Sequence, residues 1–435
     1  MKVVLVAMVF IVGSCIGSAL AQTGLSDSLT EERAVGLTLA NHPAIRQAEY
    51  GLAASGAQIA VSRSARYPDI SFDAGYVRIG PVPQFELPGQ APIELAPYNN
   101  YDLHIILEQT LYDFGRTDET IHAAETFRQT AADNVDLIKF SLAYQTINGF
   151  YNILILHQRI AVLEEQLQTL NQHFDISVKK MRAGTATDFD TLTVQVRIAV
   201  IQNDRIDALR MLETQEIVFR QLTALPSDAP INLSGAFASD KLGLNTDSLI
   251  KVASRQRPEL ALSRDAEASA EAKSQLVSLG NKPLLALQVA SGFKNGYEPN
   301  LNRWQENYAA GLALKIPVFN GHKTARQRDE ANAILNMART HTIDLEQQIY
   351  SEVRQAIANA NLSMEKIAST ETQVHQAEKA VSMARARYAA GVITNLDLLD
   401  AETALSQTKL IRLRALYDYT VSLKELNRAT GKILW

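Results

Sequence analysis

The chain has 435 residues, with 42 basic and 47 acidic side chains and a formal net charge of −5. The length allows two or three domains, and the charge balance excludes the strongly basic surface that nucleic acid or anionic lipid would need. The eight histidines are too far apart for a helical zinc motif, and the chain has neither a phosphate-binding glycine loop nor a serine-nucleophile elbow. The sequence therefore predicts no enzyme, no cofactor and no metal site.

Residues 1–21 have the pattern of a secretory signal peptide. Lys2 precedes an apolar run too short to span a bilayer, and an A-x-A cleavage site stands directly before Gln22. The alternative is a lipoprotein signal in which Cys15, the only cysteine, becomes the lipidated first residue, although VGSC fits that pattern poorly. We expect an exported protein whose mature chain starts at Gln22 without a thiol. No later apolar run reaches 18 residues, so any membrane role would depend on strands.

A first structural repeat is predicted over 22–225. A helix of about 22 residues leads to Pro68, and two strand-like segments follow within about 68–110. A long helical hairpin is predicted over about 114–225, because residues 116–183 contain one glycine and no proline. At 1.5 Å per residue its first helix would be about 100 Å long. Helices of this length need coiled-coil-like packing along their sides.

A linker or equatorial segment over 226–245 leads into a second structural repeat over 246–435. The order of elements is the same: a helix, two strand-like segments within about 283–317, and a helical hairpin over about 321–430. Residues 322–390 contain neither glycine nor proline, which favours one uninterrupted helix.

The two repeats correspond position by position. Pro43 corresponds to Pro258, 215 positions later, whereas beyond the strands Gly184 corresponds to Gly391, 207 positions later. The eight additional residues of the first repeat fit its proline-rich loop between the strands. The chain is therefore predicted to be an internal duplication.

The four strand-like segments alternate apolar side chains with polar or small ones, as in YDLHIILEQ. This alternation over about ten residues is typical of membrane-spanning strands, and aromatic residues cluster near the strand ends, where a membrane interface would lie. These residues are Tyr67, Tyr76, Tyr98, Tyr101, Phe293, Tyr297, Trp304 and Tyr308. Four strands cannot close a barrel, and an open sheet edge is not stable in hydrocarbon. Several chains would therefore have to share one barrel.

Three motifs follow the strands or form the second hairpin turn: LYDFGR at 111–116, PVFNGHK at 317–323, and YAAGVITNLDLLDAETAL from position 388. With these motifs in this order and spacing, the whole mature chain resembles the outer-membrane efflux, or TolC-like, family. The resemblance implies an α+β membrane protein in the outer membrane of a Gram-negative bacterium. It also implies a homotrimer, in which four strands per chain form a 12-stranded β-barrel that a 12-helix α-barrel continues into the periplasm.

The function implied by the resemblance is that of a channel-tunnel, the passive exit duct of a tripartite efflux or type I secretion system. Its partners would be outer-membrane lipid, a periplasmic adaptor (membrane fusion) protein, and an inner-membrane pump that supplies the energy and largely selects the cargo. The alternative is a periplasmic coiled-coil adaptor or structural protein with no pore. That alternative explains one helical hairpin but not two, each preceded by paired strands.

The two helical hairpins turn at similar stretches, MRAGTATDFDTLT and YAAGVITNLDLLD. A glycine, which adopts positive φ without strain, ends each first helix, and a Thr-x-x-Asp capping box starts each second helix. Asp190 and Asp397 could serve only these helix starts, or they could act in a pore. The small turn residues could likewise only reverse the chain, or they could contact the adaptor. These turn residues are Gly184, Thr187, Gly391 and Thr394.

Two aspartates one turn apart form rings of carboxylates at the periplasmic constriction of the family. Asp397 and Asp400 match them, and their i, i+3 spacing places them on one helical face. Three chains would bring six carboxylates together, and these would raise one another's pKa and attract cations. The resemblance therefore implies a cation-selective pore that divalent ions can block.

The family also joins its inner and outer hairpins by a gate hydrogen bond from a tyrosine to an aspartate. Tyr388 and Asp190 match these two positions. A second family tie, from an arginine to a threonine, falls on Ile393 and Phe189 and cannot form. Apolar contact is one alternative for holding this gate.

Overall fold

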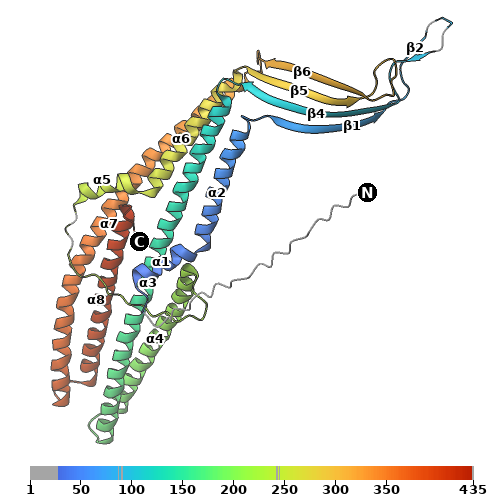
Figure 1. Ribbon diagram of the computed structural model, residues 1–435. Helices are drawn as coiled ribbons and strands as arrows, with labels where there is room; N and C mark the ends of the chain where they lie inside the picture. Colours follow the sequence, from blue (N-terminus) through green and yellow to red (C-terminus); the bar gives the residue numbers. More distant parts are fainter. Residues whose placement is uncertain (1–27, 87, 90–91, 242, 244, 434–435) are drawn as a thin grey trace, which may run out of the picture.

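The computed structural model describes residues 28–86, 88–89, 92–241, 243 and 245–433. Figure 1 shows an elongated molecule in which two helical hairpins have their tips at one end, while a sheet extends from the opposite end. The predicted signal peptide, including Cys15, and the predicted mature start at Gln22 lie outside the described residues.

Four long helices form the two hairpins. They are α3 (Arg116–Arg182), α4 (Asp188–Thr223), α7 (Lys323–Ala389) and α8 (Asn395–Ala429). Both α3 and α7 have 67 residues, which makes each about 100 Å long. We call α3–α4 the first hairpin and α7–α8 the second hairpin.

A pair of shorter helices precedes the strands of each half. These pairs are α1 (Glu31–Asn41) with α2 (Pro43–Ser64), and α5 (Thr246–Gln256) with α6 (Pro258–Ser278), which a short 3₁₀ turn follows at Leu279–Asn281. A proline at the first position of α2 and α6 disfavours the helical conformation in the residue before it. His42 and Arg257 are accordingly extended, with ψ of 127° and 120°. From the sequence we expected only the longer helix of each pair.

The strands form one antiparallel sheet in the order β1-β4-β5-β6. They are β1 (Asp69–Arg78), β4 (Asn99–Tyr112), β5 (Leu284–Lys294) and β6 (Gln305–Lys315). Because β4 of the first half pairs with β5 of the second, the halves meet in the middle of the sheet and β1 and β6 are its edges. The proline-rich loop adds a small hairpin that we did not predict, formed by β2 (Gln84–Phe85) and β3 (Ile93–Glu94).

The two faces of the sheet differ in polarity. Ile70 lies opposite Leu107, which lies opposite Val289, so one face is apolar across three strands. On the other face, Asp73 lies opposite His104. The apolar face is not covered by the chain itself, since Ile70 is 62% exposed. An exposed apolar face of this kind fits contact with lipid.

Aromatic side chains gather at the end of the sheet that is farther from the helices. The ring of Tyr101 lies 5.2 Å from that of Tyr76 and 5.1 Å from that of Trp304. Rings in this position suit a membrane–water interface, where an amphipathic aromatic group is stable.

The helix α3 is the central element of the packed part of the molecule. It contacts α1, α2, α4, α6 and α8, and its Phe150 packs in a buried cluster with Phe219 of α4. Residues 226–241 cross beside this cluster, where the backbone N–H of Leu29 donates to the carbonyl oxygen of Asn232 at 2.7 Å. Among the described residues, no helix has a stretch long and apolar enough to cross a membrane.

Candidate functional site

Each hairpin tip ends its first helix on a glycine in the left-handed region. Gly184 has a φ of 76° and Gly391 a φ of 73°. The N–H of the next residue reaches back to a carbonyl of the preceding helix at 2.9 Å in both tips. A residue with a Cβ is strained at such φ values, so both turns favour glycine, as predicted.

Each returning helix starts with a capping box. The N–H of Thr187 donates to the carboxylate of Asp190, and that of Thr394 to the carboxylate of Asp397, both at 2.8 Å. In return, the aspartate N–H groups donate to the two threonine hydroxyls at 3.3 and 3.2 Å. The predicted capping boxes are thus confirmed. Hydrogen bonds from the Thr394 hydroxyl and backbone N–H hold the pKa of Asp397 below its ordinary value.

The two aspartates assigned to the constriction lie one turn apart at the start of α8. Asp397 and Asp400 are both exposed, as pore-lining side chains must be. Asp400 also lies 3.6 Å from the guanidinium group of Arg197 on α4, so it forms an ion pair between the two hairpins. Rings of carboxylates require further copies of the chain and stay a prediction.

Asp190 and Tyr388, the pair assigned to the gate hydrogen bond, lie close to the tips, but each contacts other partners in a single chain. The carboxylate of Asp190 is held by Thr187, and Tyr388 is buried, with the ammonium group of Lys180 at 3.7 Å from its ring centre. The same ammonium group donates to the carbonyl oxygen of Tyr388 at 3.0 Å. Within the described part of a single chain, no hydrogen bond joins the side chains of Asp190 and Tyr388. A bond between them stays a prediction for the assembled protein.

The positions of the missing arginine–threonine tie are not both buried in a single chain, and an apolar contact there in place of the tie stays a prediction. Phe189 is 74% exposed, and Ile393 is half-buried. Within one chain the hairpins are joined by apolar packing, with Leu399 of α8 in the buried cluster of α3 and α4, and also by polar contacts.

The main polar contact between the hairpins is a buried cluster around His173 of α3. Its Nε2 lies 2.6 Å from Oδ1 of Asn395, and its Nδ1 lies 3.4 Å from Oε2 of Glu402, both on α8. The amide group of Asn395 donates to the backbone carbonyl of Asp190 at 3.1 Å, and Arg385 of α7 lies 3.0 Å from the other oxygen of Glu402. Sequence reasoning missed this cluster, because His173 is 222 and 229 positions from its two partners on α8.

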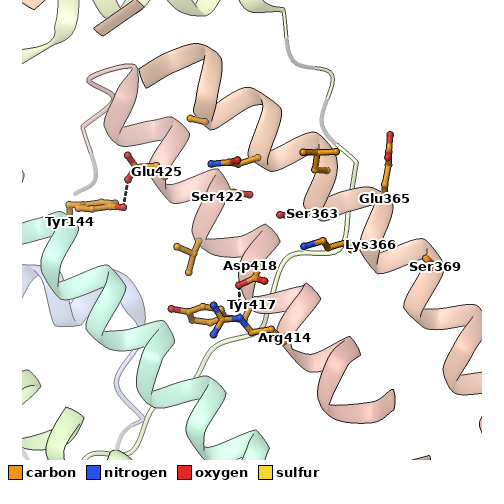
Figure 2. Close-up of a pocket in the computed structure, with 14 residues that line it drawn as sticks. Tyr144, Ser363, Glu365, Lys366, Ser369, Arg414, Tyr417, Asp418, Ser422 and Glu425 are labelled. Atoms are coloured by element: carbon orange, nitrogen blue, oxygen red, sulfur yellow. Dashed lines mark hydrogen bonds and ion pairs between the residues drawn. The ribbon is translucent and has the colours of Figure 1, made fainter. Parts of the chain in front are cut away.

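A concave region lies between α3, α7 and α8, near the middle of α7 (Figure 2). It is a groove of about 910 Å³, lined in part by Lys366 and by Arg414, which pairs with Asp418 at 2.7 Å. Tyr144 donates a hydrogen bond to Glu425 at its other end. Because most of these charged groups already have partners, we assign no ligand to the groove. In the described ranges, no group of three or more His, Cys, Asp or Glu side chains is arranged to hold a metal ion.

The sequence matches the family described as outer membrane efflux protein over residues 34–225 and 249–432. The chain belongs to the outer membrane efflux protein family. This efflux protein therefore resides in the outer membrane of a Gram-negative bacterium and extends into the periplasm. The TolC-like resemblance drawn from the sequence is confirmed.

Two curated relatives illustrate the similarity of this efflux protein to known ones. It is 26% identical to the alkaline protease secretion protein AprF of Pseudomonas aeruginosa, over 77% of this chain and 70% of AprF. It is 23% identical to the outer membrane protein TolC of Vibrio cholerae, over 86% of this chain and 84% of TolC.

Solved structures show the same fold at low sequence identity. The outer-membrane channel OprN has a TM-score of 0.80 at 17% identity and covers 93% of this chain, which in turn covers 90% of OprN. The CmeC outer membrane channel of Campylobacter jejuni has a TM-score of 0.80 at 14% identity. The match covers 99% of this chain and 94% of CmeC. The efflux protein thus has the fold of one chain of a TolC-like channel. Its relatives are channels, which supports a non-enzymatic function and favours a channel over a periplasmic adaptor.

Proposed function

We propose that this efflux protein is a homotrimeric channel-tunnel, the passive exit duct of a tripartite efflux or type I secretion system. The observation that carries the proposal is the open four-stranded sheet, apolar on one face, joined directly to helices about 100 Å long. Three such sheets provide the 12 strands of a closed barrel, and three pairs of hairpins provide a 12-helix tube below it.

The free edges of the sheet support the sharing of one barrel by several chains. In the described residues, β1 and β6 each have a strand partner on one side only. Each unpaired backbone polar group in hydrocarbon costs roughly several kcal/mol of free energy. The edge strands β1 and β6 must therefore pair with further strands in the membrane.

An apolar stripe on α4 supports contact between copies along the helical tube. Phe189, Leu192 and Val196 follow one another at helical spacing and are 74%, 57% and 65% exposed. A stripe of this kind is unfavourable in water, and a helix from a neighbouring copy would cover it.

The carboxylates at the tip of the second hairpin would form the constriction of this duct. Asp397 and Asp400 from three copies would place six negative charges in a narrow opening, which favours cations and divalent ions in particular. Mutual repulsion would oppose the lowering of the Asp397 pKa that Thr394 causes in one chain.

The gate would be held by ties between the first and second hairpins. We propose that the Tyr388–Asp190 hydrogen bond of the assembled channel acts together with the ion pair of Asp400 with Arg197. A periplasmic adaptor would open the gate by contacting the tip turns, at Gly184, Thr187, Gly391 and Thr394, and an inner-membrane pump would supply the energy.

The test is single-channel conductance of the purified protein in a planar lipid bilayer, with and without divalent cations. We expect a small cation-selective conductance that divalent cations block. The double variant Asp397→Asn/Asp400→Asn should lose this block. The matched control is Asp188→Asn, which removes an exposed carboxylate from the tip of the first hairpin and should leave the block unchanged.

Two results would contradict the proposal at different levels. Divalent block that persists in the double variant would remove Asp397 and Asp400 from the constriction while leaving the duct intact. A folded, membrane-inserted oligomer without any ion conductance would contradict the duct itself.

A further inference from the structure

The internal duplication holds residue by residue in the sheet. Leu103 on β4 lies opposite Ala74 on β1. The repeat offsets, 207 positions for β4 and 215 for β1, lead from these two residues to Ala310 on β6 and Val289 on β5. Ala310 and Val289 also lie opposite each other. The strand pairs β1–β4 and β5–β6 are therefore equivalent in register.

The two halves of the chain meet at what we call the internal interface. There β4 pairs with β5, and beyond the sheet α3 packs against α6. By the repeat, β6 and α7 are equivalent to β4 and α3, while β1 and α2 are equivalent to β5 and α6. Because β6 and β1 are the two edges of the sheet, a ring of copies brings β6 of one copy beside β1 of the next. Equivalent elements then meet again, at what we call the copy interface.

The internal interface predicts a register for the copy interface. Within the chain, Glu108 of β4 lies opposite Gln288 of β5, and the Gln288 amide donates to the Glu108 carboxylate at 3.4 Å. The equivalent residues are Lys315 of β6 and Asp73 of β1. The same register at the copy interface places Lys315 of one copy opposite Asp73 of the next, where opposite charges stabilise the strand pairing.

The two charges favour this register over its neighbours. Lys315 and Asp73 both lie on the polar face of the sheet, and a shift by one residue would bring the polar face of one edge against the apolar face of the other. A shift by two residues would put Lys315 opposite Ser71 or Gly75, which carry no charge. In the part of the chain that the structure describes, Lys315 and Asp73 are exposed and neither has an ion-pair partner. Each can therefore neutralise the other.

The apolar face agrees with the same register. Leu312 of one copy would lie opposite Tyr76 of the next, as Ile105 lies opposite Ser291 at the internal interface. Leu312 is 67% and Tyr76 57% exposed in a single chain. Pairing an aliphatic with an aromatic side chain across two strands stabilises a sheet.

Beyond the sheet, a basic residue occupies the same place at both interfaces. The guanidinium group of Arg116, at the start of α3, donates to the carbonyl oxygens of Leu279 at 3.1 Å and Lys282 at 3.4 Å, in the turn that ends α6. A cation is favourable there because the last carbonyl groups of a helix lack partners within it. The equivalent of Arg116 is Lys323, which is exposed at the start of α7, and the equivalent turn is 64–67 at the end of α2.

We propose that the copy interface repeats the internal interface, so that Lys315 of one copy pairs with Asp73 of the next, and Lys323 binds the carbonyl groups that end α2 of the next copy. This inference rests on the proposed oligomeric duct and names the contacts that join its copies. Because every copy offers both surfaces, the contact is repeated from copy to copy until the ring closes.

Disulfide cross-linking tests the register directly. Cys15, the only cysteine, lies in the predicted signal peptide, so the predicted mature chain has no competing thiol. We expect Ala313→Cys/Gly75→Cys to cross-link neighbouring copies, because the equivalent residues lie opposite each other at the internal interface. A shift by two residues in one direction would instead favour Gly311→Cys/Gly75→Cys. The opposite shift would favour Ala313→Cys/Val77→Cys, and both displaced pairs should cross-link much more slowly.

Exchanging the charges gives a second measurement that needs no cysteine. Lys315→Glu brings like charges together at every copy interface, so the trimer should dissociate at a lower temperature in detergent, as followed by native mass spectrometry. Lys315→Glu/Asp73→Lys should restore the wild-type temperature. Lys323→Ala should lower it, because the end of α2 loses a donor. The matched control Glu108→Lys, at the equivalent position of the internal interface, faces the neutral Gln288 and should leave the temperature unchanged.

The outcomes separate this inference from the proposed duct. A trimer that cross-links faster through a displaced pair, with no recovery on charge exchange, would overturn the inference and leave the duct intact. An unchanged temperature in Lys323→Ala would overturn the contact with α2. A trimer that cross-links as expected but conducts no ions would support the interface and contradict the duct, and a protein that stays monomeric in the membrane would contradict both.

Discussion

The tips of the first and second hairpins share one local structure but differ in what surrounds it. Both have a glycine with positive φ and the same capping box. Leu192 and Leu399 are equivalent by the repeat offset, yet Leu192 is 57% exposed and Leu399 is fully buried. The turn is encoded locally, whereas burial depends on which helix packs against the turn.

The neighbours of α4 and α8 explain the difference. α8 lies against both α7 and α3, so one face at the start of α8, which includes Leu398 and Leu399, is covered within one chain. α4 packs mainly on α3, and its opposite face is left exposed. The duplicated sequence therefore has one returning helix that packs on two helices of its own chain and one that leaves an apolar face exposed.

Introducing negative charge into the exposed apolar stripe of α4 should have the largest effect, because it would separate the copies of the proposed trimer. We expect Phe189→Asp/Leu192→Asp to abolish the trimer, since a buried interfacial carboxylate without a partner is strongly unfavourable. The oligomeric state is measured by light scattering or native mass spectrometry in detergent.

The control for that experiment is Leu396→Asp at the position equivalent to Phe189. Leu396 is 53% exposed on α8, and if α8 faces the lumen, the trimer should persist. A trimer that survives the Phe189→Asp/Leu192→Asp substitution would show that another surface joins the copies.

Truncating the two equivalent leucines should give a smaller but clear difference within each chain. Leu399→Ala removes a fully buried side chain and should cost about 2–5 kcal/mol of unfolding free energy. Leu192→Ala should cost much less in the unassembled chain, where Leu192 is 57% exposed. Denaturant unfolding followed by circular dichroism measures both, and equal losses would contradict the assigned difference in burial.

Removing the helix caps should give the smallest effect, and an equal one at both tips. Thr187→Ala and Thr394→Ala should each cost about 1 kcal/mol locally. Hydrogen exchange of the first turns of α4 and α8 measures this cost.

The second tip should also respond to acid. The pKa of Asp397 is lowered in the folded chain. The capping box of Thr394 and Asp397 therefore stabilises the fold at pH values above the pKa of an unfolded aspartate, and this stabilisation is lost as the pH falls. Thr394→Ala should remove this acid dependence at the second tip. An acid response that persists in Thr394→Ala would mean that another group causes it.

Several features of the fold could be predicted from the sequence because each depends on local physical chemistry. The absence of breaker residues predicts α7 as one helix, the alternation in YDLHIILEQ predicts a strand, and the Gly and Thr-x-x-Asp patterns predict the two turns. The breaks before Pro43 and Pro258 were also readable, since proline restricts the residue before it, but we did not use them to separate the shorter helices.

The sequence by itself thus determined the long helices, the four long strands, the two tip turns, the duplication and the family of this protein. Only the tertiary structure decided that Leu399 is buried and Leu192 is exposed, and that His173 meets Asn395 and Glu402 across more than 200 positions. Backbone propensity and capping act over a few residues, whereas these contacts depend on how whole helices pack against one another. Two stretches with the same local pattern can therefore form the same turn in different surroundings.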